Sequence, residues 1–364
     1  MVELRAGIIG MGVMGMLHAG TLNSLENVKV IAVTELEKLV IKFIQKFLPN
    51  VKVYEDFKEM IEKENLDFVY ITTPVKSHIS IATYCAKKDI PFFIEKPLSR
   101  TATECKELCK ILRNKKITNM VGFNLRYSST FLKAKELLDK KSIGKITNVK
   151  ATAFRTLVLK EGTGWRFQKE SSGGGVLVDI GIHMIDLLLW FFGKIEKVKI
   201  EEISFVFPEI DDSVSASLEF ENKIKCMFET AWNVKNYRLQ ETTLEIHGEL
   251  GKIKVNEDYV KIQYFKSDEE IWYRQSLYKG VEIDIGGSMY TWEDTDFVNC
   301  LRNEKQLGSN IINSAQVQSV IDSIYEFHLV YSEVKSVLIS GNIFAIKVIK
   351  VLFLALMAYL ASTS

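Results

Sequence analysis

The sequence predicts an α/β protein with two sheet domains, the first built on a parallel sheet and the second on a mostly antiparallel, open sheet. In residues 1–123, short apolar strands alternate with amphipathic helices, which is typical of a parallel sheet with crossover helices. From residue 146 to about residue 277, polar and apolar residues alternate over long β-rich runs joined by short turns such as Glu221-Asn222. This alternation indicates an antiparallel sheet with one packed face and one exposed face.

The composition narrows the classes of partner and compartment. The chain has 364 residues, 47% apolar and 26% charged, and is long enough for two domains with a large core. A net charge of +1 without a basic block offers no field for nucleic acid, so we expect no nucleic-acid partner. The five cysteines form no CxxC pair, which predicts reduced thiols and no metal site. The N-terminus runs into a strand without an apolar signal region, and we expect a cytoplasmic protein.

Six strands are predicted for the first domain, which we bound at residues 1–123. They are Arg5–Gly10, Lys29–Thr34, Lys52–Tyr54, Phe68–Thr73, Pro91–Glu95 and Asn119–Phe123. Residues 124–340 then form the second domain, in which residues 291–338 return to helix after the sheet. The exposed face of the second sheet is a candidate surface for a homo-oligomer.

A glycine-rich turn after the first strand predicts a Rossmann dinucleotide-binding domain. The turn consists of Gly10, Met11, Gly12, Val13, Met14 and Gly15, and it opens a helix. Glycines allow a tight turn, and the helix N-terminus then faces a pyrophosphate. The second strand ends at Glu35, where a carboxylate would bind the ribose hydroxyls. Because this carboxylate repels a 2′-phosphate and no arginine follows it, NAD is favoured over NADP. The alternative is a glycine turn that only packs strand against helix.

Two further strand ends lie at the carboxyl edge of the same sheet, where open α/β folds bind ligands. They carry Thr72-Thr73-Pro74, followed by His78, and Glu95-Lys96-Pro97. The apolar strand before Lys96 should partly desolvate its amine, which favours an acid/base role. The alternative is a solvated lysine paired with Glu95.

Residues 173–193, GGGVLVDIGIHMIDLLLWFFG, predict one buried helix that begins with three glycines and is closed by Gly193. Its ionisable residues are Asp179, His183 and Asp186, whose spacings of four and three place them on one stripe. Such groups are costly to bury unless they are paired or functional. The alternative is a core histidine satisfied by Asp179, although Gly181 between the two predicts close approach by another group.

The C-terminal residues 341–364 differ in character from the rest of the chain. Residues 343–361 are apolar except for Lys347 and Lys350. The stretch is just long enough to span a bilayer if these lysines snorkel, but its uncharged part from Val351 is short. A helix at a subunit interface or on the domain, membrane association and a disordered end all stay open.

The chain resembles the Gfo/Idh/MocA oxidoreductases over about residues 5–330. Four stretches carry the resemblance in order: GMGVMG (10–15), TTPVKSH (72–78), EKP (95–97) and GGGVLVDIGIHMID (173–186). The resemblance implies that Lys96, Asp179 and His183 form the catalytic group beside the nicotinamide. It also implies a set of cofactor-lining residues: Thr73, Pro74, His78 and Glu95. Many members have Asn where this chain has Val75.

The resemblance extends to residues expected near the substrate. GFNLRY (122–127) resembles the crossover into the second domain and places Asn124 and Arg126 near the cleft. Trp165 and Arg166 resemble the segment that lines the sugar pocket, and a stacking Trp with a hydrogen-bonding Arg suits a polyhydroxylated ring. The alternative for both arginines is a surface salt bridge.

Together these features predict an NAD(H)-dependent oxidoreductase acting on a hydroxyl-bearing carbon of a sugar, nucleotide sugar or cyclitol. Lys96 would hydrogen-bond the hydroxyl and share its proton with His183, while Asp179 would orient the imidazole. Two alternatives are an NAD-dependent glycoside hydrolase on the same fold and a non-catalytic NAD-sensing regulator. The sequence identifies neither the substrate, the direction of the reaction nor the oligomeric state.

Overall fold

A computed structural model describes residues 2–340, apart from 157–167, 208–209, 236, 238, 267, 282–283, 285, 304 and 306–307. Trp165, Arg166 and the apolar tail at 341–364 lie outside the described residues, so the predictions for them stay predictions.

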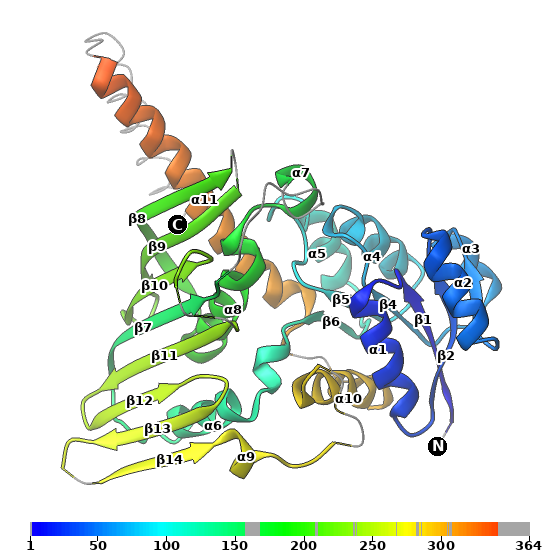
Figure 1. Ribbon diagram of the computed structural model, residues 1–364, viewed down its shortest axis with the longest axis horizontal. Coiled ribbons are helices and arrows are strands. Elements are labelled where there is room, and N and C mark those ends of the chain that lie inside the picture. The colour runs from blue at the N-terminus through cyan, green and yellow to red at the C-terminus, as the bar shows by residue number, and fades with distance from the viewer. Residues whose placement is uncertain are drawn as a thin grey trace.

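The first sheet is fully parallel, with the strand order β3-β2-β1-β4-β5-β6 (Figure 1). Its strands are β1 (Leu4–Ile9), β2 (Val28–Thr34), β3 (Lys52–Tyr54), β4 (Phe68–Ile71), β5 (Phe92–Glu95) and β6 (Asn119–Gly122). This order defines the doubly wound dinucleotide-binding fold. The predicted Rossmann domain is confirmed, and each predicted strand end lies within two residues of the observed one.

Helices cover both faces of the first sheet. They are α1 (Val13–Ser24), α2 (Lys38–Phe47), α3 (Phe57–Lys63), α4 (His78–Lys87) and α5 (Lys106–Arg113), with a 3-10 turn η1 (Val75–Ser77). Every residue of β4, β5 and β6 is buried, because a parallel sheet with crossover helices is covered on both sides. The carboxyl ends of these strands therefore offer the open edge at which a ligand can bind.

The second sheet has eight strands in the order β14-β13-β12-β11-β7-β10-β9-β8. They are β7 (Ile146–Phe154), β8 (Ile195–Phe207), β9 (Ile210–Phe220), β10 (Lys225–Ala231), β11 (Glu241–Gly248), β12 (Gly251–Val255), β13 (Tyr259–Tyr264) and β14 (Glu269–Tyr273). All neighbouring pairs are antiparallel except β7 with β10. The predicted mostly antiparallel open sheet is confirmed.

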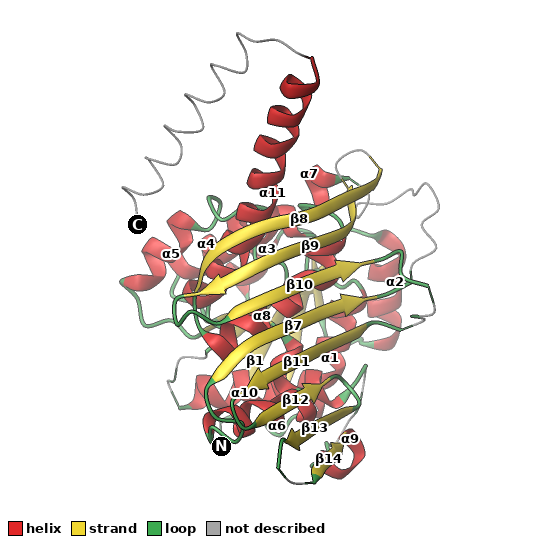
Figure 2. Ribbon diagram, turned by 90° about the vertical axis from the view of Figure 1, so that its left-hand side faces the viewer, coloured by secondary structure: helices red, strands yellow, loops and turns green. Residues whose placement is uncertain are grey.

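The helices of the second half lie on one side of this sheet, and Figure 2 views the sheet from its other face. They are η2 (Asn124–Tyr127), α6 (Ser129–Asp139), α7 (Lys169–Ser172), η4 (Leu177–Gly181), α8 (Ile182–Phe192), α9 (Arg274–Leu277), α10 (Ser288–Arg302) and α11 (Ile311–Ser340). Of these, α10 packs on α1, η2 and β6. Among the described residues, only the stretch Lys169–Phe192 is long and apolar enough to cross a membrane, and 78% of its most apolar part is buried. It has the burial of a core helix.

One helix crosses the boundary proposed after residue 123. Phe297, Val298 and Cys300 of α10 belong to the apolar core that lies between α1 and the first sheet. The predicted division into 1–123 and 124–340 therefore leaves out a piece of the first core. Helix was predicted over residues 291–338, but nothing local in the sequence shows which sheet a distant helix packs on.

Candidate active site

A cavity of about 1120 Å³ lies at the carboxyl edge of the first sheet and reaches the η4–α8 segment of the second domain. Thirteen residues predicted from sequence line it: Gly10, Gly12, Val13, Met14, Glu35, Thr72, Thr73, Pro74, Glu95, Lys96, Asn124, Asp179 and His183. Four others are not among its lining residues: Met11, Gly15, His78 and Arg126. The cavity thus gathers the dinucleotide turn and the proposed acid/base residues along one continuous wall.

Each of the three glycines of the turn is needed for a different structural reason. Gly10 has a φ of +96°, which other residues rarely adopt. A Cβ on Gly15 would lie 2.0 Å from the carbonyl oxygen of Gly10, so helix and turn can pack only with glycine there. A Cβ on Gly12 would meet nothing within 4 Å, which leaves open space in front of the α1 N-terminus. This geometry fits a pyrophosphate at the helix end.

Glu35 presents a fixed carboxylate at this end of the cavity. Its Oε2 accepts a hydrogen bond from the backbone N–H of Met11 at 2.8 Å, and its Oε1 accepts from Leu36 and Glu37 at 2.7 and 2.9 Å. A carboxylate has more lone pairs than these three donors occupy, so it can still accept from ribose hydroxyls. Glu37 and Glu55 line the same cavity and add negative charge, which disfavours a 2′-phosphate.

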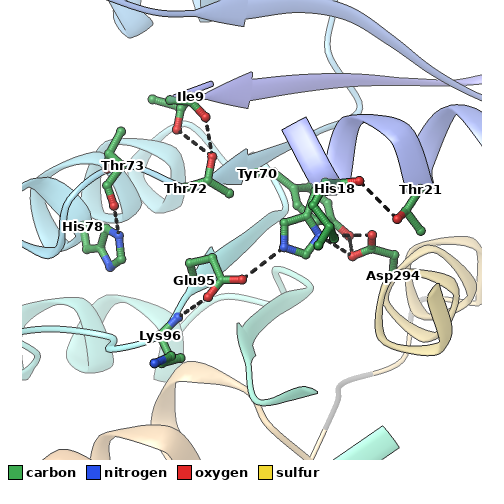
Figure 3. Close-up of polar contacts among 12 residues, drawn as sticks. Ile9, His18, Thr21, Tyr70, Thr72, Thr73, His78, Glu95, Lys96 and Asp294 are labelled. Carbon is green, nitrogen blue, oxygen red and sulfur yellow. Dashed lines mark hydrogen bonds and ion pairs between the residues drawn. The ribbon is translucent and has the colours of Figure 1, made fainter. Parts of the chain in front are cut away.

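His78 is a buried link between two loops. Its ring nitrogens lie 2.8 Å from the carbonyl oxygen of Pro97 and 2.7 Å from that of Thr73, as Figure 3 shows for Thr73. Burial lowers the pKa of His78, against the opposing effect of the two carbonyls. The residue was predicted to line the cofactor, but it lies behind the wall. It holds the TTP and EKP loops at a fixed separation.

Lys96 extends from the end of β5 to the opposite wall of the cavity. Its ammonium donates a hydrogen bond to the backbone carbonyl of Asp179 at 2.7 Å, and it lies 3.8 Å from the Asp179 carboxylate. The Glu95 carboxylate accepts from the backbone N–H of Lys96, not from its ammonium. The alternative of a solvated lysine paired with Glu95 is therefore wrong.

The 173–193 segment is buried, as predicted, but its first turns are not regular α-helix. Residues Leu177–Gly181 form a π turn ahead of α8, and Gly193 follows the helix with a φ of +86°. Gly175 packs on Asp211 of β9, whose carboxylate accepts from the N–H groups of Gly175 and Leu177. A Cβ on Gly181 would lie 3.1 Å from Thr230 of β10. The group that closely approaches Gly181 is thus the sheet.

The π turn separates the roles of the three ionisable residues on this segment. Asp179 contacts Lys96, whereas Asp186 accepts two hydrogen bonds from Arg126, at 2.6 and 2.7 Å. Nδ1 of His183 has no hydrogen-bond partner among the described residues. The alternative interpretation, a core histidine hydrogen-bonded to Asp179, is therefore wrong. Burial, with the nearby charge of Lys96, lowers the pKa of His183 well below its ordinary value. The imidazole is neutral at physiological pH.

Arg126 is a partner of the helix and not a lining residue. Its side chain is 12% exposed and that of Asp186 is 1% exposed. The guanidinium also lies over the Trp190 ring, 5.8 Å from its centre. The alternative of a surface salt bridge is right that Arg126 forms an ion pair, but the pair is buried and not at the surface. Sequence placed Arg126 near the cleft, but the local pattern does not show which carboxylate holds it.

Several lining residues were missed by the sequence analysis. The second domain contributes Arg155, Ser172, Trp232 and Gln240, and α10 contributes Tyr290. Arg155, Trp232 and Gln240 lie next to strand ends, whereas Ser172 and Tyr290 are in helices, and the five share no motif. Three buried polar atoms on the cavity wall have no hydrogen-bond partner among the described residues: Asn124 Oδ1, His183 Nδ1 and Trp232 Nε1. Buried polar groups are normally paired, so these atoms are available to a ligand.

The described part of the chain has no cluster of side chains suited to metal binding or to thiol chemistry. No group of three or more His, Cys, Asp or Glu side chains there could hold a metal ion. All five cysteines are described, and they are buried and free. Burial raises the pKa of the Cys85 and Cys105 thiols to about 12, which keeps them protonated and unreactive.

Fold and cavity define a class: a two-domain protein whose dinucleotide-binding sheet shares a cavity with a second, antiparallel sheet domain. Residues 4–123 match the model of an oxidoreductase family with an NAD-binding Rossmann fold, and residues 131–254 match the model of the GFO/IDH/MocA C-terminal domain. The chain belongs to the Gfo/Idh/MocA oxidoreductase family.

Curated relatives of this chain include two dehydrogenases. It is 28% identical over 228 residues to levoglucosan dehydrogenase of Pseudarthrobacter phenanthrenivorans, covering 55% of this chain and 58% of the relative. It is 26% identical over 206 residues to myo-inositol 2-dehydrogenase of Thermotoga maritima, covering 57% and 58%. The match thus spans less than two thirds of these relatives. A solved structure of levoglucosan dehydrogenase with NADH and levoglucosan has the same fold, with a TM-score of 0.81, 24% identity and coverage of 89% of this chain and 96% of that one.

Proposed function

We propose that the protein is an NAD(H)-dependent dehydrogenase that oxidises or reduces a hydroxyl-bearing carbon of a sugar, nucleotide sugar or cyclitol. The observation that carries this proposal is that one cavity is lined by the dinucleotide turn, by Lys96 and by a neutral His183, whose Nδ1 has no hydrogen-bond partner among the described residues. Membership of an NAD-binding oxidoreductase family supports it, as do relatives named for levoglucosan and myo-inositol.

The residues of the cavity fit the dinucleotide. Gly12 leaves room at the α1 N-terminus for the pyrophosphate, and Glu35 would accept hydrogen bonds from a ribose. Thr73, Pro74 and Asn124 would line the remainder towards Lys96. When bound, NAD supplies the site that accepts or donates the hydride.

The acid/base work falls to Lys96 and His183. Lys96 has three N–H donors, of which the Asp179 carbonyl takes one, so another can bind a substrate hydroxyl. The neutral His183 can take the proton of that hydroxyl during oxidation and return it during reduction. Asp179 is a positioning residue in this scheme, because its contacts go to Lys96 and not to the imidazole.

The unpaired polar atoms support a polyhydroxylated substrate. A hydroxyl both donates and accepts, so it can satisfy the indole N–H of Trp232, the amide oxygen of Asn124 and the imidazole nitrogen of His183. Leaving such groups unpaired is costly, which favours a ring with several hydroxyls over an apolar ligand. A screen of sugars, sugar phosphates, nucleotide sugars and inositols, following NADH absorbance, tests the proposal. NAD binding with no turnover of any of them would favour the NAD-sensing regulator.

Glu35 should set the preference for NAD. We expect Glu35→Ser with Leu36→Arg to move the kcat/KM ratio towards NADP, because repulsion is lost and Leu36, which is 74% exposed, gives an arginine room to reach a phosphate. Steady-state kinetics with both cofactors measure this shift, and the exposed Glu62→Ser is the control. A wild-type protein that already prefers NADP would contradict the assignment of Glu35.

We infer that the protein is cytoplasmic and forms a homo-oligomer through the face of the second sheet that its helices do not cover.

Deleting residues 341–364 should leave NAD binding intact, because every residue of the proposed site lies upstream. The deletion should change the assembly state or membrane partitioning, since so apolar a stretch is costly to leave in water. Sedimentation and vesicle flotation measure both. Identical behaviour with and without the tail would remove the interface and membrane hypotheses together.

A further inference from the structure

A histidine outside the predicted site lies at the centre of a buried charge cluster next to the cavity. His18 is on α1, three residues after the last glycine of the dinucleotide turn, and is fully buried. Its Nε2 lies 3.1 Å from the Glu95 carboxylate, and its Nδ1 lies 2.9 Å from that of Asp294 on α10. Figure 3 shows the imidazole between the two carboxylates. Three segments far apart in the sequence therefore meet at one ring.

We propose that His18 is a positioning residue that fixes Lys96 through Glu95, and that it does so as an imidazolium. The step to Lys96 is direct, because the second oxygen of Glu95 accepts the backbone N–H of Lys96 at 3.0 Å. His18 thus links the helix that faces the pyrophosphate to the residue that binds the substrate hydroxyl. The kinetic part of the proposal rests on the proposed dehydrogenase function.

Each ring nitrogen lies within hydrogen-bond distance of a carboxylate, and an imidazolium can donate to both. Two carboxylates cannot both be satisfied by a neutral imidazole, which has one N–H, whereas an imidazolium has two. Burial opposes the charge, but Asp294 and Glu95 outweigh it and raise the pKa of His18 to about 10. The tilted rings of Tyr70 and Phe93 fill the space beside it, with centres 5.1 and 4.9 Å away.

The surrounding groups either support this charge or are uncharged themselves. Tyr70 of β4 donates its hydroxyl to Asp294 at 3.0 Å, and Tyr290 of α10 lies edge-on to the imidazole. Glu293 of α10 is fully buried, with both carboxyl oxygens unpartnered among the described residues. Burial and the neighbouring Glu95 raise its pKa well above the ordinary value, which favours the uncharged carboxyl. The imidazolium therefore faces Glu95 and Asp294; burial raises the pKa of Asp294, and His18 acts in the opposite direction.

The first test needs no substrate. Nitrogen NMR of the cofactor-free protein at about pH 8.5, two units above an ordinary histidine pKa, should show one imidazole with both nitrogens protonated, and its signal should vanish in His18→Gln. Hydrogen exchange of the Lys96 amide should become at least about tenfold faster in His18→Gln, because Glu95 loses its anchor. His247→Gln, on the second sheet, is the control. A neutral His18, or unchanged Lys96 exchange, would overturn the proposal.

The second test separates positioning from general stability. On the best substrate, His18→Gln should lower kcat by about tenfold or more while KM for NAD changes little. Placed in a Lys96→Met background, the same substitution should cost almost nothing further, because its effect acts through Lys96. Additive losses would mean that His18 only stabilises the fold. Failure of the dehydrogenase proposal alone would leave the NMR and exchange results unaffected.

The contribution of His18 to the free energy of unfolding should change with pH in a defined direction. Its pKa is raised on folding, so the contribution is complete below about pH 6.5 and is lost as pH rises through about 10. The difference in thermal midpoint between wild type and His18→Gln should therefore be largest below pH 6.5 and shrink towards pH 10. A difference that grows with pH would contradict the imidazolium.

Discussion

Replacing Lys96 with Met, or His183 with Ala, should lower turnover by about two to four orders of magnitude, the usual range for acid/base assistance. The two side chains serve one proton transfer in the proposed mechanism, so the double variant should be little worse than either single one. NAD affinity should change little, because the turn at 10–15 and Glu35 lie at the other end of the cavity. Steady-state kinetics and cofactor titration measure the two effects separately.

Matched controls make this prediction specific. Lys87→Met removes an exposed lysine of α4 whose ammonium is paired with Glu107, and His247→Ala removes a histidine of the second sheet; both should retain wild-type turnover. Asp179→Asn should be milder than Lys96→Met, because the backbone carbonyl that binds the ammonium is kept. Near-wild-type turnover of the double variant would mean that Lys96 and His183 only support the structure.

Arg126→Met should destabilise the protein by about 3–5 kcal/mol, the usual cost of removing one partner from a buried ion pair. The substitution leaves the Asp186 carboxylate, 1% exposed, without its two hydrogen bonds inside the core. Burial already raises the pKa of Asp186. Part of the cost is therefore avoided if the carboxyl takes up a proton. Urea unfolding, followed by circular dichroism, measures the change.

A double variant tests why Arg126→Met loses stability. Arg126→Met with Asp186→Leu should recover most of the stability, because no unpaired charge is then buried. Lys223→Met, which breaks an exposed pair with Glu196, should leave the unfolding midpoint unchanged. If Arg126→Met unfolds like wild type but raises the KM of the substrate, then Arg126 binds substrate and the role given to it here is wrong.

The first domain could be predicted because its signals are local. A strand, a glycine turn and an acidic residue at the next strand end occupy one short stretch, and each glycine there has a steric reason that any reader of the sequence can anticipate. The arrangement of Asp179 and His183 on their helix was predicted only in part. Regular helical spacing places Asp179 and His183 together, but the π turn at Leu177–Gly181 turns Asp179 towards Lys96.

The long-range contacts could not be predicted from the sequence. Arg126 and Asp186 are separated by 60 residues, and His18 and Asp294 by 276, so no local spacing connects them. One signal was present for His18, a lone histidine on the buried side of the helix after the glycine turn. It becomes informative only when Glu95 and Asp294 are placed beside it in three dimensions.

The central claim, dehydrogenation at a hydroxyl-bearing carbon assisted by Lys96, is tested most directly by following the transferred hydrogen. The best substrate from the screen is labelled with deuterium on the reacting carbon and incubated with NAD, and the nicotinamide is examined by proton NMR. We expect deuterium at C4 of the reduced nicotinamide with wild type, and a rate lower by at least about a hundredfold with Lys96→Met. Reduced cofactor without deuterium, or equal rates in the two proteins, would contradict the account.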